Sequence, residues 1–369
     1  MASRLRVLTG SKHLFSSHPF RLSTRAIHIF RTVPPLRTYR KQLLLSDRTV
    51  GLVPTMGALH EGHLSLVRQA AAENTDVFVS IYVNPTQFGV HEDLDSYPKT
   101  WESDMAMLEA LDAELAQDKE AGEWREGKQR GRITAVFAPT TKVMYPTLPP
   151  SSEIPGEGSF VTITPLASRL EGASRPVFFR GVATVCMKLF NIVTPTRVYF
   201  GQKDVQQTVV IKRMVQDFHI DTEVRVGPTK READGLAMSS RNVYLGERRR
   251  KVGVVLSRAL MAAEEQWKKG KRGRGDILWQ ADDVVDQKKL EQDDLPPAKR
   301  ALFEVDYISL ADPDTLEEVE EVDEKRGAIL SGAIKMKPLE EPQEGEDCGL
   351  GGGAVPVRLI DNIVLKPRS

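Results

Sequence analysis

The chain has 369 residues and 40% hydrophobic content, which is enough to bury at least one full core and is typical of two domains. Its 51 basic residues equal its 51 acidic ones, so the composition argues against nucleic acid or a membrane surface as a partner and favours small molecules. Two cysteines are too few for a disulfide framework or a four-thiolate zinc site, and we expect Cys186 to be a free, buried thiol. No apolar run approaches the roughly 20 residues that span a bilayer.

The N-terminal segment is basic and contains no acidic residue before Asp47. An arginine-rich, serine-containing segment without acidic residues is typical of an organelle transit peptide. The alternative is a disordered basic tail on a cytosolic enzyme. We therefore expect residues 1–32 to be one or the other, with a mitochondrial location in the first case and a cytoplasmic location in the second.

Strand and helix patterns alternate along the next part of the chain. Short runs of β-branched residues predict strands, and apolar residues spaced three or four apart predict helices. This alternation is typical of an α/β fold with a mostly parallel sheet covered on both faces. The expected strands span residues 49–53, 76–83, 133–137, 197–200 and 222–226, and the expected helices span residues 63–73, 101–116, 182–193 and 205–218.

The pattern changes near residue 230, so the first domain is expected to cover residues 33–229 and a smaller α+β domain residues 230–369. A loop over residues 227–242 leads there to a helix around residues 251–268. Three segments rich in charge, Gly or Pro are expected to be solvated surface insertions. The strand-like segments of the second domain span residues 303–310, 327–333 and 357–363, and the expected insertions span residues 117–132, 269–300 and 335–353.

The sharpest local feature is the segment PTMGALHEGH, residues 54–63, between an expected strand and an expected helix. Backbone N–H groups and the positive dipole end at a helix start favour phosphate, and Gly57 and Gly62 allow close backbone approach. His60 and His63 could then stabilise charge on an α-phosphate under attack. A purely structural role at the helix start is the alternative. A zinc pair is disfavoured because helical ligands usually lie four apart and no third ligand can be named.

Two further segments have the chemistry of phosphate binding. Residues 200–204, FGQKD, follow an expected strand, so Lys203 lies at the sheet edge where ligands of α/β proteins bind. Residues 238–242, MSSRN, offer two hydroxyls and a guanidinium that could grip the β- and γ-phosphates. The alternative for MSSRN is a helix-capping turn with a solvent-facing arginine. No GxGxxG follows a strand, so a nicotinamide cofactor is not indicated.

Five segments follow one another along the chain: PTMGALHEGH (residues 54–63), VNPTQFG (83–89), LEGASRP (170–176), FGQKDVQQ (200–207) and DGLAMSSRN (234–242). Together and in this order they closely resemble the pantothenate synthetases, or pantoate–β-alanine ligases, of the HxGH nucleotidyltransferase superfamily. The resemblance runs from about Val33 to Tyr244 and continues weakly to the C-terminus. It implies a Rossmann-like domain and an ATP-dependent ligase that joins (R)-pantoate to β-alanine through a pantoyl adenylate, with Mg²⁺ and in a homodimer.

The resemblance also implies roles for residues. His63 takes the place of the catalytic proton donor, with His60 and Lys203 beside the phosphates. Gln87 and Gln207 are similar to the pantoate-binding glutamines, with Asn84 as a neighbour, and β-alanine is assigned to Gln87 and Arg175. The implied ATP-binding residues are Met56, Gly57, Ala58, Leu59, His60, Glu61, Gly62, His63, Gly201, Gln202, Lys203, Asp204, Lys230, Met238, Ser239, Ser240 and Arg241.

Two positions depart from the family pattern. Phe178 stands where the family usually has histidine, and Gln202 stands where glutamate is usual. Either the histidine is dispensable or the substrate contacts are rearranged around Arg175. The competing functions are another HxGH nucleotidyltransferase that acts on a phosphorylated substrate, and a catalytically silent nucleotide-binding protein. Residues 238–241, at the domain junction, are the expected lid.

Overall fold

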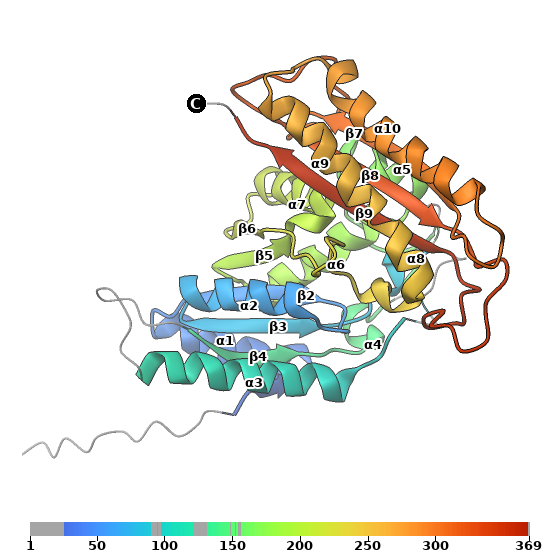
Figure 1. The fold of residues 1–369 in the computed structure, drawn as a ribbon. Helices are drawn as coiled ribbons and strands as arrows, with labels where there is room; N and C mark the ends of the chain where they lie inside the picture. The colour runs from blue at the N-terminus through green and yellow to red at the C-terminus, as the bar shows by residue number, and fades with distance from the viewer. Residues whose placement is uncertain are drawn as a thin grey trace, which may run out of the picture.

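The computed structural model describes residues 26–89, 94, 97–120, 131–147, 149–151, 153 and 156–367. Its larger part is built on a parallel sheet of six strands in the order β1-β4-β3-β2-β5-β6 (Figure 1). After β2 the chain adds β3 and β4 on one side of β2, and it then adds β5 and β6 on the other side. The connections that leave β2 and β5 therefore run in opposite directions from two neighbouring strands. The strands are β1 His28–Phe30, β2 Val50–Thr55, β3 Asp76–Ile81, β4 Arg132–Phe137, β5 Arg197–Gly201 and β6 Glu223–Gly227.

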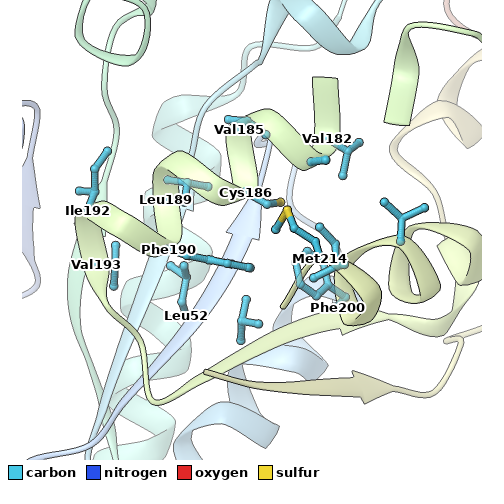
Figure 2. Packing of buried hydrophobic residues seen from close by; sticks show 14 of the residues in the cluster. Leu52, Val182, Val185, Cys186, Leu189, Phe190, Ile192, Val193, Phe200 and Met214 are labelled. Atoms are coloured by element: carbon cyan, nitrogen blue, oxygen red, sulfur yellow. The ribbon is translucent and has the colours of Figure 1, made fainter. Parts of the chain in front are cut away.

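Helices cover both faces of this sheet, each over its own hydrophobic core. On one face α1, α6 and α7 pack against Leu52 of β2 and Phe200 of β5, and on the other face α2 and α3 pack against Val53 and Val79. Figure 2 shows the first core, in which the nearly continuous apolar sequence of α6 lies over the sheet and Met214 of α7 joins it. The helices are α1 Val33–Leu45, α2 Glu61–Glu73, α3 Trp101–Glu120, α6 Phe178–Val193 and α7 Val205–Asp217.

Short helical turns connect these elements near the sheet's carboxyl edge. The first of them is held against α6 through Gly181, because a Cβ at Gly181 would lie 2.2 Å from the carbonyl oxygen of Thr86. The absence of a side chain there lets the loop after β3 approach the helix. The turns are η1 Pro85–Gln87, α4 Thr141–Met144, η2 Leu166–Ser168, α5 Glu171–Ser174, η3 Gln202–Asp204 and η4 Ser240–Tyr244.

The C-terminal part forms a second layer with its own core. An antiparallel sheet, β7-β8-β9, is packed against α9 and α10, which lie above it in Figure 1. No helix in the described part of the chain is long and apolar enough to cross a membrane. These elements are α8 Gly246–Gly253, α9 Val255–Lys268, α10 Arg274–Asp293, β7 Phe303–Ala311, β8 Ala328–Met336 and β9 Val357–Leu365.

The expected fold class, a Rossmann-like α/β domain followed by a smaller α+β domain, is confirmed. The N-terminal tail ends earlier than expected, because His28–Phe30 is an edge strand of the main sheet; residues 1–25 lie outside the described residues. The prediction of a surface insertion over 269–300 is wrong. Most of that segment is α10, which buries Ile277 and Val285 against α9. Residues 121–130 of another expected insertion lie outside the described residues.

The third expected insertion, residues 335–353, is confirmed as a surface excursion for most of its length, because residues 340–345 and 350–352 are exposed and no helix or strand lies between Met336 and Val357. Its start completes β8, and its later part is tied to α8 by Arg249, whose side chain is fully buried. The Arg249 guanidinium donates hydrogen bonds to the carbonyl oxygens of Leu245, Tyr244, Val355 and Cys348. One buried cation therefore fastens the excursion between β8 and β9 to the end of η4.

Replacing Arg249 by alanine should lower the free energy of unfolding by about 2–4 kcal/mol, because buried carbonyl groups lose their donor and a cavity is left. Urea unfolding followed by circular dichroism measures this difference. Arg258→Ala is the matched control, since Arg258 is an exposed arginine on the next helix and its loss should change stability by less than about 0.5 kcal/mol. Equal stability of the two variants would contradict the proposed role of Arg249.

Candidate active site

A cavity of about 1000 Å³ lies where the carboxyl ends of β2 and β5 face the C-terminal sheet. Ligands of open α/β sheets bind at this point, where neighbouring strands run on to diverging connections. The far wall comes from β7 to β9 and includes Tyr307, Arg358 and Asn362. The volume lies at the upper end of the range for small-molecule sites, so it can hold a nucleotide together with a second small ligand.

His60 and His63 line the cavity at the start of α2, and backbone hydrogen bonds determine which nitrogen of each ring carries a proton. The backbone N–H of Gly62 donates to Nδ1 of His60 at 3.1 Å. The backbone N–H of His60 donates to Nδ1 of His63 at 3.3 Å. A backbone amide is always the donor, so each Nδ1 must be unprotonated and a neutral ring carries its proton on Nε2. Both rings therefore offer an Nε2–H donor.

The surroundings keep both rings neutral. Burial comes first, followed by the repulsion that a protonated His60 would exert and by the charge of Lys203, and together they lower the pKa of His63 to about 3. Burial and Lys203 also lower the pKa of His60 below its ordinary value. The ring centroids are only 4.1 Å apart, so two imidazolium ions here would repel each other strongly. In the unliganded protein the pair acts as hydrogen-bond donors and not as cations.

The backbone N–H groups at the start of α2 form hydrogen bonds within their own turn. The N–H of Gly62 is taken by the His60 ring, and the N–H groups of His63 and Leu64 donate to the carbonyl oxygen of His60 at 2.8 and 3.1 Å. These three amides are satisfied within the turn, and phosphate binding at the start of α2 stays a prediction. The imidazole Nε2–H groups extend the donor function of the helix start into the cavity.

The loop before these histidines is held by Asp104 of α3, a buried carboxylate that sequence reasoning missed. Its oxygens accept from the backbone N–H groups of Ala58 at 3.0 Å and Leu59 at 2.8 Å, and from the hydroxyl of Thr100 at 3.1 Å. Gly57 has φ +86° and Ala58 has φ +49°, so the loop turns through the left-handed region twice. Asp104 stabilises this turn and thereby the position of His60.

The second ATP segment meets the C-terminal sheet. Lys203 and Asp204 line the cavity, and Lys203 Nζ lies 3.8 Å from an Asp204 carboxylate oxygen. The side-chain amide of Asn362 on β9 donates to the carbonyl oxygens of Gln202 and Lys203, both at 2.8 Å. Arg231 binds the adjacent Asp361 through two hydrogen bonds. The last strand of the chain therefore fixes the lysine-bearing turn.

Gln87 lines the cavity, whereas Asn84 does not. Asn84 is fully buried: its Nδ2 donates to Gln87 Oε1 at 2.9 Å and to the carbonyl oxygen of Gly181 at 3.2 Å. Its Oδ1 accepts from the hydroxyls of Thr86 and Tyr145 at 3.1 and 2.7 Å. The expected contact of Asn84 with a substrate is therefore replaced by a positioning role. It holds the oxygen end of the Gln87 amide, which leaves the Nε2 end to donate to a ligand.

The paired glutamines of α7 have different surroundings. Gln206 is buried, and its Nε2 donates to the carbonyl oxygens of Leu166 and Arg169 at 2.8 and 2.6 Å. Gln207 is partly exposed and lines the cavity, as expected for a ligand contact. Cys186, also on the wall, is a free buried thiol as predicted, and burial raises its pKa to about 12, so the thiol stays protonated.

Arg175 and Phe178 lie together at the start of α6 and both line the cavity. The Arg175 guanidinium carbon is 3.9 Å from the centroid of the Phe178 ring, and the guanidinium donates to the carbonyl oxygen of Gln87 at 3.3 Å. Phe178 in turn packs edge-on against the buried Phe179, with centroids 4.9 Å apart. The phenyl ring that replaces the expected histidine therefore supports Arg175 beside Gln87.

The segment Met238 to Arg241 closes the remaining side of the cavity, with Lys230 nearby on the wall. The backbone N–H of Met238 donates to the carbonyl oxygen of Lys230 at 2.9 Å. Ser239 caps η4 by accepting from the backbone N–H of Arg241 at 3.3 Å, which is the capping alternative considered for this motif. The segment caps η4 and also forms part of the cavity wall, because all four residues from Met238 to Arg241 line the cavity.

Most of the expected site residues reach the cavity wall, and the others support it. Ala58 and Leu59 bind Asp104, Glu61 pairs with Arg68, and Gln202 is held by Asn362. Asp361 and Asn362 could have been suspected as two polar residues within an apolar strand pattern; Asp104 is one acidic residue among many on its helix. The expected ATP-binding residues that do not line the cavity are Gly57, Ala58, Leu59, Glu61 and Gln202.

Comparison with known proteins shows which family this chain belongs to. Residues 28–364 match the family model described as pantoate-beta-alanine ligase. A pantothenate synthetase of Roseiflexus castenholzii is 46% identical over 337 residues, which cover 91% of this chain and 99% of the relative. A pantoate–beta-alanine ligase of Saccharomyces cerevisiae is 39% identical over 347 residues, with 91% and 99% covered.

Solved structures agree with these relatives. The crystal structure of pantothenate synthetase from Thermus thermophilus superposes with a TM-score of 0.68 at 35% identity, over 92% of this chain and all of that one. A pantoate-beta-alanine ligase from Francisella tularensis, described as complexed with beta-gamma ATP and beta-alanine, has a TM-score of 0.61 at 27% identity, over 92% and 98% of the two chains.

In the free protein the His63 ring should stay neutral, with its proton on Nε2, as the pH falls from 8 to 5, because its pKa is lowered to about 3. Long-range ¹H–¹⁵N NMR distinguishes the two ring nitrogens, and a His63→Gln variant assigns the signal. Since the unfolded chain takes up this proton near pH about 6.5, the shift also makes folding stability decrease as the pH falls from that value. Protonation of the folded ring near pH 6.5 would contradict this assignment.

Proposed function

The chain belongs to the pantoate–β-alanine ligase family, and from this premise we propose that it condenses (R)-pantoate with β-alanine to give pantothenate. ATP is converted to AMP and diphosphate, and a pantoyl adenylate is the intermediate. The observation that carries the proposal is the shared cavity, in which two oriented imidazole donors, Lys203 and the amide of Gln87 converge. Such a set serves both phosphate chemistry and recognition of a small hydroxy acid.

In the first step a pantoate carboxylate oxygen attacks the α-phosphorus of ATP and diphosphate leaves. We assign the Nε2–H groups of His60 and His63 to the α-phosphate, where they stabilise the negative charge that grows in the transition state. Lys203 lies on the same wall as a basic side chain that can pair with the phosphates. Ser239, Ser240 and Arg241 grip the β- and γ-phosphates as they become the leaving group.

The pantoate molecule is assigned to the amides of Gln87 and Gln207, which bind its hydroxyl and carboxylate oxygens. Asn84 holds the oxygen end of the Gln87 amide, so this side chain presents a donor without losing rotamer entropy on binding. The adenine ring is assigned to the Met56 and Lys230 side of the cavity. These assignments place the carboxylate of pantoate near the paired imidazoles.

In the second step the amine of β-alanine attacks the acyl carbon of the adenylate and AMP leaves. The acyl–oxygen bond to AMP breaks as the carbon–nitrogen bond forms, and the amine loses a proton. We assign the carboxylate of β-alanine to Arg175, which lies beside Gln87. The cavity is closed by residues 238–241 and the C-terminal sheet, which protects the adenylate from hydrolysis.

We propose that Mg²⁺ enters as the MgATP complex. Among the described residues no group of three or more His, Cys, Asp or Glu side chains is arranged to hold a metal ion. Phosphate oxygens and waters commonly provide most of the Mg²⁺ ligands in such sites, and Asp204 is the carboxylate next to Lys203 on the wall. Chelation of Mg²⁺ with EDTA should abolish turnover without changing the folded state seen by circular dichroism.

The oligomer and the cellular location are further proposals from the sequence. We propose a homodimer formed through the first domain, which light scattering at several concentrations would test. For residues 1–27, which precede β1, we propose a mitochondrial transit peptide, with a cytoplasmic enzyme as the alternative. Fusing residues 1–27 to a fluorescent protein distinguishes the two locations, because fluorescence spread through the cytosol would exclude import into mitochondria.

The proposed activity predicts pantoate-dependent release of diphosphate from MgATP, and formation of AMP and pantothenate only when β-alanine is added. Purified protein, a coupled diphosphate assay and mass spectrometry measure these products. His63→Ala is the matched inactive variant: losing one preorganised donor should lower kcat by about 100-fold or more while ATP still binds. Absence of pantoate-dependent diphosphate release in the native protein would exclude the proposal.

Asp104→Asn should lower kcat by about 10-fold or more without touching a substrate, because an amide NH₂ would face a backbone N–H that the carboxylate now accepts. The loop of Ala58 and Leu59, and with it His60, would then lose its fixed position. Steady-state kinetics of adenylation measure the effect. The control is Asp112→Asn on the same helix, which pairs with Arg132 away from the cavity and should leave kcat unchanged.

A further inference from the structure

We propose that Phe178 is a positioning residue that holds Arg175 in place to receive the carboxylate of β-alanine. This inference rests on the proposed function for the identity of the ligand. Its structural basis is the stack already described, in which the Arg175 guanidinium carbon lies 3.9 Å from the ring centroid. An aromatic face attracts a guanidinium through its quadrupole, and the attraction is stronger where water is partly excluded.

The ring itself has little freedom to move. Phe178 is the first residue of α6, and its backbone N–H donates to the Arg175 carbonyl oxygen at 3.1 Å, which ties the two residues into one turn. Its ring packs at 78° against Phe179, whose side chain is buried in the main core. The sheet core, the helix start and the phenyl ring therefore form a continuous support beneath the guanidinium.

The stack leaves the edge of the guanidinium for hydrogen bonding. One NH₂ group donates to the carbonyl oxygen of Gln87, which orients the planar group beside the proposed pantoate amide. A carboxylate binds a guanidinium at its in-plane N–H groups with up to two parallel hydrogen bonds, so a stack on the face does not compete with the carboxylate. A phenyl ring also carries no proton in the working pH range, so the support does not change with pH. An imidazole at position 178 would titrate near neutral pH.

Three variants separate stacking from general packing. Phe178→Leu keeps apolar volume but removes the aromatic face, and Phe178→Tyr restores it. Phe160→Leu is the matched control, because Phe160 stacks with Arg180 at 4.1 Å but does not line the cavity. We expect Phe178→Leu to raise the KM for β-alanine by about 3- to 10-fold and to leave pantoate-dependent diphosphate release unchanged. The Tyr variant and the Phe160 control should keep the native KM.

A double-mutant cycle with Arg175→Met tests whether Phe178 acts through Arg175. If it does, Phe178→Leu will raise the KM for β-alanine in the native background and have no further effect once Arg175 is replaced. Additive effects of the two substitutions would overturn the inference. So would a loss in kcat of adenylation with an unchanged KM for β-alanine, because that is the result of a merely structural role.

An NMR measurement keeps this inference distinguishable from the proposed function. The Arg175 Nε–H resonance should be shifted upfield by the Phe178 ring, lose that shift in Phe178→Leu and retain it in Phe178→Tyr, whatever reaction the protein catalyses. A native protein without pantoate-dependent diphosphate release would reject the function alone. A native protein that is active but shows no ring-dependent shift of Arg175, or no change in the KM for β-alanine in Phe178→Leu, would reject the role of Phe178.

Discussion

Two backbone hydrogen bonds to imidazole nitrogens determine what the cavity can do. Because the N–H groups of Gly62 and His60 occupy Nδ1 of His60 and His63, each neutral ring must direct its proton outward on Nε2. Gly62 permits this geometry, since a Cβ there would lie 2.8 Å from the His60 ring. The buried Asp104 holds the loop that supplies these amides. The donor pair is therefore a property of the backbone turn as much as of the two side chains.

Internal hydrogen bonds also orient a donor on the substrate side of the cavity. There the buried polar groups around Asn84 satisfy one another and hold the oxygen of the Gln87 amide, so that the Nε2 end faces the ligand. Asn84 uses both N–H groups and its oxygen within the protein, so the Gln87 amide can have only one orientation in this network. Gly181 allows this by letting η1 lie against α6. Preorganisation of this kind reduces the entropy lost on binding, which is the advantage of building a site on packed elements.

Sequence reasoning could predict most of the wall but little of what supports it. The strand and helix order followed from periodicity, and the phosphate segments followed from residue types at strand ends, which is where β2 and β5 place them. Asn84 was assigned to a substrate because proximity in sequence to Gln87 does not show which polar atoms are already paired. Residues 269–300 looked solvated because α10 has acidic and basic residues around a narrow stripe formed by Ile277, Ala281 and Val285. Asp104 and Asn362 act across the fold, where sequence spacing carries no information.

The cavity wall combines basic side chains with neutral imidazole donors, and this combination has a consequence for catalysis. Lys203 and Arg241 are the basic side chains of this wall, whereas burial and Lys203 keep His60 and His63 neutral before a nucleotide arrives. A bound triphosphate would raise the pKa of both rings, so any proton taken up by the pair would be coupled to nucleotide binding. Neutral rings can nevertheless donate from Nε2 without that uptake. The stabilisation of an α-phosphate in the transition state then depends on fixed donors rather than on an imidazolium, and it is available as soon as the ligand is in place.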